Sequence, residues 1–264
     1  MKKKKKLNFI LKHFFYYLIR YVPIPKLKHK LCLSVLAKQN SLPLYLGVAK
    51  GNTAVQVGTP NTLTLNRLSR LVGVDGTVVI VEAEPSNAER LKAEIVRRTI
   101  DNVHIVAKGA WSSKGSIMLN KSDKFDGDHK IEVPNVCMDN DFRTEYEEKV
   151  EIEVDTVDNI LTELELPEIN YLSITVNGAE HEVLKGSVET LRRSSNIRVF
   201  SKGHARQGDA SSGEPINVPI SNLLEELGYA VTVTHGEKST AGIESWQYRD
   251  GDVFGWKTPS MLIG

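Results

Sequence analysis

The chain has 264 residues, of which 41% are hydrophobic, so it can build a sizeable core and is not an intrinsically disordered protein. Its net charge of +1 hides a division, because residues 1–50 carry twelve Lys or Arg and no acid, leaving 22 basic and 33 acidic side chains for the rest. Two cysteines, Cys32 and Cys137, exclude a disulfide framework, lack metal-like spacing and indicate a reducing compartment.

The first 24 residues resemble a membrane-surface helix more than a signal peptide or a membrane span. Lys12, His13 and Arg20 interrupt the apolar run, and no small-residue cleavage site follows. With helical periodicity the polar side chains share one face and the aromatic side chains lie on the apolar remainder. Such a basic helix suits an anionic membrane surface, where each Lys or Arg contributes about 1 kcal/mol.

Two alternatives for this arm stay open. The helix could pack on the main domain, or the lysines could contact nucleic acid, although aromatic residues confined to the apolar face argue against the latter. A second basic stretch, residues 26–39, follows Pro23 and Pro25 and is also typical of a helix. We therefore expect residues 1–50 to be a basic, amphipathic helical arm on a cytoplasmic protein, peripheral at the inner face of the membrane.

Residues 51–264 alternate between strand-like and helix-like patterns, which predicts a doubly wound, mostly parallel sheet with helices on both faces. Strands are expected at 53–58, 76–84, 103–111, 150–155, 172–176, 196–204 and 229–235. Helices are expected at 61–73, 85–99, 156–164, 179–185 and 220–228. Residues 112–119 are typical of a hairpin arm, and we expect residues 252–264 to close the edge of the sheet.

In a sheet of this kind the ligand lies outside the carboxyl ends of the strands. That rim is expected to carry Gly58, Thr59, Glu82, Ala83, Ala110, Trp111, Thr175, Asn177 and His204. Gly58 lets the backbone approach a ligand closely, and the helix after it offers free N–H groups. Glu82 ends the second strand at the spacing typical of a carboxylate that accepts hydrogen bonds from both ribose hydroxyls of an adenosine cofactor.

Two stretches on this rim resemble the FkbM-type methyltransferases, a family of S-adenosylmethionine-dependent, Rossmann-like (class I) enzymes. "EAEPSNAERL", residues 82–91, is similar to the family's E-P-x-P-x-N-x-x-x-L segment. "ITVNGAEHEVLKG", residues 174–186, is similar to its I-D-x-E-G-x-E-x-x-V-L-x-G. The resemblance covers about residues 53–204 and implies S-adenosylmethionine as cofactor, O-methylation of sugars or secondary metabolites as activity, and a place for Thr175 and Asn177 beside the transferred methyl group.

The departures from the family pattern are as informative as the matches. The motif D-x-G-x-N-x-G appears here as residues 56–62, with Gln56 in place of the acid and only its first glycine kept. The motif D-x-E-G loses both acids, because Thr175 and Asn177 stand in their places. Thr and Asn orient a ligand by hydrogen bonds but do not act as bases. Cofactor binding is therefore expected to survive better than catalysis.

The predicted cofactor site consists of residues on the first three strand ends: Gln56, Gly58, Thr59, Glu82, Ala83, Ala110 and Trp111. Trp111 either flanks the adenine or is a core tryptophan. His204 is the candidate general base, since its unperturbed pKa lies near 6.5; the alternative is a loop histidine without chemistry. Glu180 is explained most simply as an acid that favours its helix N-terminus. No metal site is predicted.

The sequence thus predicts an O-methyltransferase acting on a hydroxyl of a glycan or lipid-linked saccharide. A cofactor-binding or scaffold protein without turnover is the second hypothesis, and an RNA methyltransferase that uses the lysine tail is the third.

Overall fold

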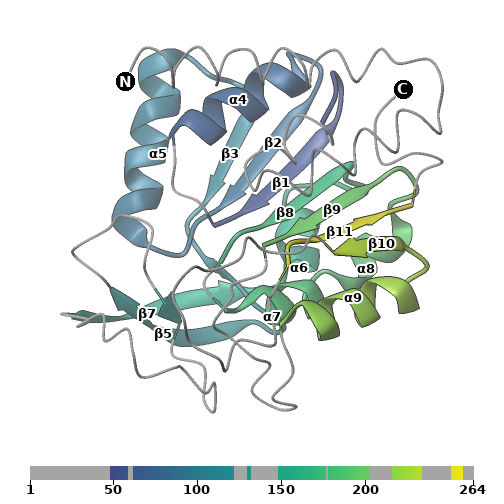
Figure 1. The fold of residues 1–264 in the computed structure, drawn as a ribbon. Helices are drawn as coiled ribbons and strands as arrows, with labels where there is room; N and C mark the ends of the chain where they lie inside the picture. The colour runs from purple at the N-terminus through teal and green to yellow at the C-terminus, as the bar shows by residue number, and fades with distance from the viewer. Residues whose placement is uncertain are drawn as a thin grey trace, which may run out of the picture.

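The computed structural model of the chain describes residues 48–58, 62–121, 130–131, 148–176, 178–202, 216–233 and 251–257 (Figure 1). The arm before residue 48 lies outside these ranges, as do Thr59, Asn177 and His204.

A seven-stranded sheet forms the centre of the described chain, in the order β10-β11-β9-β8-β1-β2-β3. Its strands are β1 (Thr53–Val57), β2 (Thr77–Val81), β3 (Val103–Val106), β8 (Tyr171–Ile174), β9 (Arg198–Ser201), β10 (Ala230–Val233) and β11 (Val253–Trp256). All pairings among β9, β8, β1, β2 and β3 are parallel. Only β11 runs antiparallel to its neighbours, β9 and β10. The predicted doubly wound, mostly parallel sheet is confirmed.

Helices cover both faces of this sheet (Figure 1). On one face lie α4 (Thr62–Val72) and α5 (Pro85–Arg98), packed over β1, β2 and β3. On the other face lie α6 (Val157–Glu163), α7 (Glu180–Lys185), α8 (Val188–Arg193) and α9 (Asn217–Glu226). These helix bounds agree with the sequence patterns within a few residues, except that α8 was not predicted.

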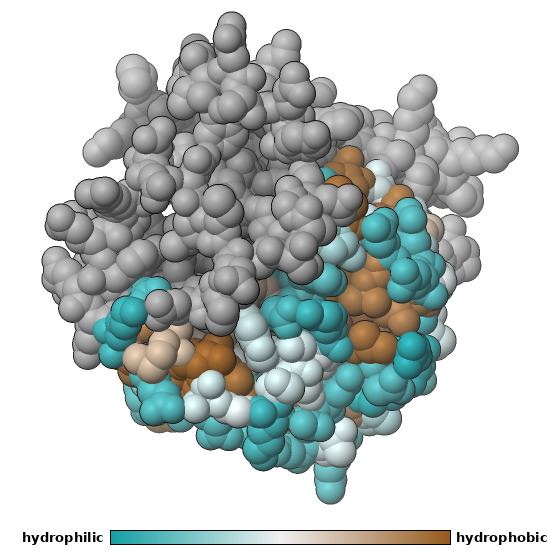
Figure 2. Space-filling model, turned by 90° about the horizontal axis from the view of Figure 1, so that it is seen from below, coloured by the Kyte–Doolittle hydropathy of each residue, from teal (hydrophilic) through white to brown (hydrophobic). Residues whose placement is uncertain are grey.

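The two faces hold two apolar clusters, as the uninterrupted apolar runs of buried parallel strands require. Ala54, Val78 and Ile80 point toward the α4 side, whereas Val55, Val79 and Leu172 point toward the α6–α9 side. Seen from below, two apolar areas of the described surface are separated by a polar band (Figure 2).

A second, smaller sheet stands beside the carboxyl end of β3 (Figure 1). Its order is β4 (Gly109–Ala110), β7 (Glu148–Asp155), β5 (Gly115–Lys121) and β6 (Lys130–Ile131). The prediction of one strand over residues 103–111 was therefore wrong. The chain leaves the main sheet after Val106, and Gly109 and Ala110 pair with β7 instead.

The break after β3 is fixed by a buried carboxylate on β7. Asp155 is fully buried and accepts hydrogen bonds from the backbone N–H of Thr156 and the amide of Asn159, both at 2.9 Å. Lys108, in the turn after β3, reaches it at 3.4 Å. Burial would raise the pKa of Asp155, but these hydrogen bonds and the Lys108 ammonium lower it below its usual range.

The C-terminal strand is also placed differently from the prediction. β11 does not close the edge of the sheet, because it inserts between β9 and β10 and leaves β10 at the edge. Its register aligns Phe254 with Phe200 of β9, and the two rings contact each other at 5.1 Å between centroids. Within the described residues, none of the helices is long and apolar enough to cross a membrane.

Candidate active site

The carboxyl ends of the parallel strands form one rim. The strand order reverses at β1, which lies between β2 and β8. β1 pairs with β2 on one side and with β8 on the other, and the helices that follow β1 and β8 lie on opposite faces of the sheet. This is the topological switch point at which doubly wound sheets bind ligands. Gly58, Glu82, Thr175 and Lys202 come directly after four of these strands.

Gly58 draws the ends of three strands together. Its N–H donates to Val81 of β2 at 2.9 Å, while Thr175 N donates to Val57 at 2.9 Å. The residue has a φ of +72°, and a Cβ on it would lie 2.2 Å from the carbonyl oxygen of Thr175. No side chain fits that space, so a glycine is required at the switch point. This explains why the first glycine of the motif is retained.

Gln56 directs its amide to this turn. The side chain is buried on β1, and its Nε2 donates to the carbonyl oxygens of Val57 and Gly58, each at 3.2 Å. Gln56 therefore supports the turn that places Gly58 at the rim.

Glu82 is a buried acid whose pKa is shifted toward neutrality. The side chain is only 5% exposed, and its Oε1 accepts a hydrogen bond from Glu84 N at 2.9 Å. Burial raises the pKa of Glu82 to about 7; the neighbouring Glu84 carboxylate adds to the rise, and the Glu84 N–H and Arg90 oppose it. A carboxylate kept out of water at a ligand rim is a candidate functional group.

Glu84 has a structural task that separates it from Glu82. It is the N-cap of α5, and its Oε2 accepts from Asn87 N at 2.7 Å and from the hydroxyl of Ser86 at 2.5 Å. Sequence reasoning did not assign this role, although Glu84-Pro85-Ser86 carries a recognisable start signal, a capping acid followed by proline. Of the two acids in this stretch, only Glu82 is left for a ligand.

Ala83 and Trp111, predicted to share the cofactor site, are brought together. Both are partly buried against the same apolar cluster of the small sheet, formed by Leu119, Ile152 and Val154. Ala110 is buried in β4, and Trp111 N donates to Asp155 O at 2.9 Å. The small sheet, which was not predicted, thus supplies the apolar backing behind both residues.

The backbone of Trp111 is held from the other side by Gly186. A Cβ on Gly186 would lie 2.0 Å from the Trp111 carbonyl oxygen. Asp158 N donates to Gly186 O at 3.0 Å, and the Asp158 carboxylate accepts from Glu189 N and Thr190 N at 3.1 and 2.7 Å, at the start of α8. Asp158 is a positioning residue that sequence reasoning missed, and Gly186, which was recognised only as part of the motif at residues 174–186, is another.

The turn after β8 is braced from within. Gly178 has a φ of +91°, and its N–H donates to Oε2 of Glu180 at 3.0 Å. Glu180 is fully buried, so its carboxylate belongs to the turn it closes, in line with the structural explanation of this acid. Thr175 is half-buried on the rim, next to Gly58. Thr59, Asn177 and His204 lie outside the described residues, so their predicted roles stay predictions.

Ser201 is a rim residue that the sequence did not single out. It ends β9 beside Ile174 and is fully buried, and its hydroxyl has no hydrogen-bond partner among the described residues. Among the described residues, no group of three or more His, Cys, Asp or Glu side chains is arranged to hold a metal.

Residues 47–231 match the methyltransferase FkbM domain, which is more than half of the chain. The chain belongs to the FkbM methyltransferase family. This confirms the family predicted from residues 82–91 and 174–186, together with the class of S-adenosylmethionine-dependent enzymes to which the FkbM family belongs. No curated protein matches the chain.

Solved structures that resemble this FkbM protein are also methyltransferases. A SAM-dependent methyltransferase from Aquifex aeolicus is 18% identical, with 85% of this chain and 94% of that chain covered and a TM-score of 0.39. Aeropyrum pernix fibrillarin with natively bound S-adenosyl-L-methionine is 13% identical, with 86% and 74% covered and a TM-score of 0.43. A protein-L-isoaspartate O-methyltransferase is 31% identical, but over only 25% of this chain and 20% of that chain, with a TM-score of 0.24. Because all three TM-scores are low, the assignment rests on the family match.

Proposed function

We propose that this FkbM protein is an S-adenosylmethionine-dependent O-methyltransferase whose acceptor is a hydroxyl of a glycan or lipid-linked saccharide. The observation that carries the proposal is the arrangement at the switch point. Gly58 leaves no side chain between β1 and β8, buried Glu82 ends the next strand, and Ala83 and Trp111 meet in one apolar cluster beside it.

These residues fit an adenosine cofactor. Glu82 would accept hydrogen bonds from the ribose hydroxyls, since Glu84 N occupies only its Oε1. Ala83 and Trp111 would flank the adenine, and Gly58 would let the backbone lie close to the rest of the molecule. When bound, the cofactor supplies an activated methyl group on a sulfonium. The protein then has to align the acceptor oxygen and take up one proton.

The acceptor side of the rim favours a neutral or anionic hydroxyl compound. β8 and β9 end in Thr175, Ser201 and Lys202, so their described ends carry hydroxyls and one cation but no carboxylate to pair with a cationic amine. The hydroxyl of half-buried Thr175 can orient a saccharide hydroxyl by hydrogen bonds. Lys202 would suit a phosphorylated or acidic sugar. We assign proton removal to His204, the nearest histidine in sequence to the end of β9.

Residues 1–24 are proposed to hold the enzyme at the inner face of an anionic membrane, where lipid-linked saccharides would be presented. The support is the run of basic residues without any acid before residue 51.

A second candidate function is a cofactor-binding scaffold that has lost turnover. It is favoured by one observation, the replacement of both acids of the family's D-x-E-G motif by Thr175 and Asn177. Restoring the acids with Thr175→Asp and Asn177→Glu separates the two hypotheses. A scaffold descended from an enzyme would gain methyl transfer, whereas a working variant would be unchanged or impaired.

The acceptor can be identified by mass spectrometry of envelope saccharides and lipids from cells with and without the gene. The proposal predicts a species that is 14 mass units heavier only when the gene is present, the mass of one CH₂. If the difference falls on RNA instead, or if a restored double variant is active while the wild type is inert, the proposal is wrong.

A further inference from the structure

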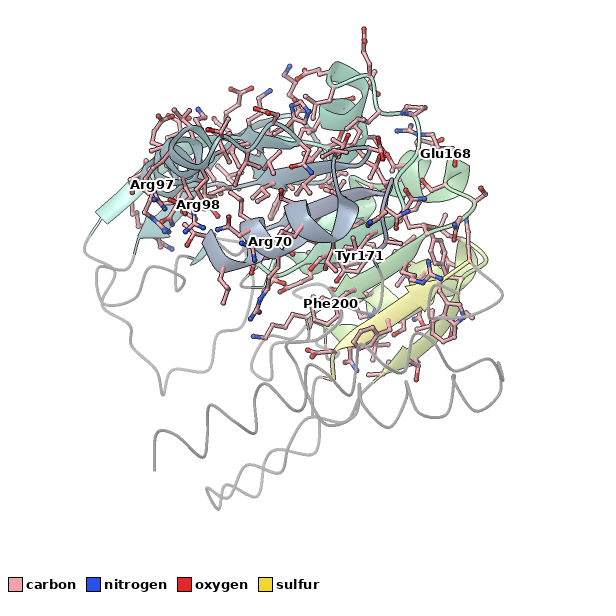
Figure 3. The ribbon with its side chains drawn as sticks, turned by 90° about the horizontal axis from the view of Figure 1, so that it is seen from above. Arg70, Arg97, Arg98, Glu168, Tyr171 and Phe200 are labelled. Atoms are coloured by element: carbon pink, nitrogen blue, oxygen red, sulfur yellow. The ribbon has the colours of Figure 1, made fainter. Side chains whose placement is uncertain are left out.

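On its α4 side, the main sheet carries a group of aromatic side chains next to the strands that α4 and α5 cover. Tyr171 of β8, Phe200 of β9 and Phe254 of β11 belong to one apolar cluster on this side. Figure 3 shows Tyr171 and Phe200 on the strands beside α4, on which Arg70 is labelled. We refer to Tyr171, Phe200, Phe254 and the partly buried Trp256 as the aromatic face.

The aromatic face is buried, and the principal contacts of the described helices account for only part of its cover. Tyr171, Phe200 and Phe254 are 1%, 5% and 6% exposed. On this side, the principal contacts of α4 are with β1 and β2, and those of α5 are with β3. The described helices that pack against β10 and β11 lie on the opposite side. α4 reaches the same apolar cluster through Leu65, Leu68 and Val72, but the principal contacts of α4 and α5 on this side do not include β9 or β11. The remaining cover of the aromatic face is therefore assigned to chain outside the described ranges.

We propose that residues 26–47 of this chain dock on the aromatic face and belong to the folded domain, leaving only residues 1–24 as the membrane arm. The place where the described chain begins supports this occupant. Val48 is fully buried and lies in the same apolar cluster as Tyr171, Phe200 and Phe254. The residues directly before Val48 are therefore delivered to this face.

Length and composition also fit. As a helix, residues 26–39 would be about 21 Å long, at 1.5 Å per residue, whereas a four-residue strand is about 13 Å long. At 100° per residue, Leu31, Val35, Cys32, Leu36 and Leu33 occupy one broad arc with Cys32 at its centre, and the polar residues Lys28, His29 and Gln39 enter this arc only in the first and last turns. Lys30, Ser34 and Lys38 fall on the opposite side.

The other segments outside the described ranges are less suitable. The described chain on both sides of residues 234–250, and the end of β9 before residues 203–215, lie at the carboxyl rim of the sheet, whereas Val48 precedes the amino end of β1. Residues 258–264 follow β11 but are too few to cover three strands. Burying a face of this size is expected to stabilise the domain, because it removes large apolar side chains from water.

The chain contains its own probe for this contact, because Cys32 lies on the predicted docking side. In a full-length Cys137→Ser variant, Cys32 is the single thiol, and its rate of maleimide labelling reports its accessibility. The matched control is a full-length Cys32→Ser, Cys137→Ser, Ser34→Cys variant, whose single thiol is on the opposite side of the predicted helix. We expect Cys32 to react about 100-fold more slowly than the thiol at position 34, and equally fast in denaturant.

Further controls identify the segment that covers the aromatic face. Protection should persist on dilution, which excludes a second copy, and without lipid vesicles, which excludes burial in a membrane. Removing residues 258–264 should leave the protection of Cys32 unchanged. Removing residues 1–24 should leave the protein monomeric and unable to bind a hydrophobic dye, whereas removing residues 1–47 should cause dye binding or aggregation. Equal labelling at positions 32 and 34, or protection that needs lipid or a second copy, would overturn the proposal.

Discussion

Replacing Glu82 by Gln should stabilise the empty protein while weakening its cofactor binding. A pKa that rises from 4.5 to about 7 on burial means that folding disfavours the ionised side chain. The corresponding free energy is about 3–4 kcal/mol at most, since each tenfold change in an acid constant is about 1.4 kcal/mol. Glutamine keeps an oxygen for the Glu84 N–H but carries no charge, so Glu82→Gln should recover much of that cost above pH 7.

The sign with pH follows from proton linkage. The unfolded chain releases the Glu82 proton near pH 4.5, whereas the folded chain keeps it until about pH 7. Relative to Glu82→Gln, the wild type therefore loses free energy of unfolding as the pH rises from about 4.5 to 7. Below and above that window, the difference in free energy of unfolding between the two proteins does not change with pH. Urea unfolding of both proteins at pH 4, 6 and 8 measures it. Glu84→Gln is the comparison, because it weakens the cap of α5 by about 1 kcal/mol and relieves only the smaller, electrostatic part of the Glu82 shift at high pH.

The same protonation governs the affinity for cofactor. If only the ionised carboxylate accepts both ribose hydroxyls, a pKa of about 7 makes the affinity rise about tenfold between pH 6 and pH 8. The Glu82→Gln variant should bind more weakly by about 1.5–3 kcal/mol at pH 8 and show no such rise. If the variant is less stable than the wild type at pH 8, burial does not destabilise ionised Glu82; if it binds cofactor equally well, Glu82 is not a ligand of the ribose.

Three other predictions concern the turn, the base and the arm. Gly58→Ala should lower the free energy of unfolding, measured in urea, by about 2–4 kcal/mol, because Gly58 has a positive φ and a Cβ there would clash with Thr175 O. The control Gly115→Ala, which has open space around it, should change the free energy of unfolding by less than about 1 kcal/mol. His204→Ala should slow methyl transfer about 10²–10⁴-fold with unchanged cofactor affinity, and the wild-type rate of methyl transfer should rise between about pH 6 and 7. A variant that transfers methyl groups as fast as the wild type would show that His204 is not the base. Deleting residues 1–24 should abolish salt-sensitive binding to anionic vesicles in a flotation assay and leave the core folded; binding indifferent to lipid charge would contradict the arm's role.

Local patterns in the sequence predict most of the main sheet. The strand before Gly58, the strand before Glu82 and the helix that begins at Pro85 each carry their own signal, in β-branched runs and start residues. Because parallel strands in a doubly wound sheet end at one edge, placing these elements in order also places Gly58, Glu82 and Thr175 on one rim.

Pairings between distant segments could not be predicted in this way. Nothing local distinguishes Gly109 and Ala110 from a continuation of β3; it is their pairing with β7 that moves them into the second sheet. β11 likewise reads as any late strand until its antiparallel partners are known. The role of Gly186 depends on its approach to Trp111, which only the folded chain creates.

The rim around Gly58 and Glu82 is proposed to bind S-adenosylmethionine, and isothermal titration with S-adenosylhomocysteine at pH 8 measures that binding. We expect saturable binding of one molecule per chain, weakened by Glu82→Ala by about 1.5–3 kcal/mol for the lost charge-assisted hydrogen bond. An absence of binding at millimolar ligand, in a sample that unfolds cooperatively in urea, would contradict it.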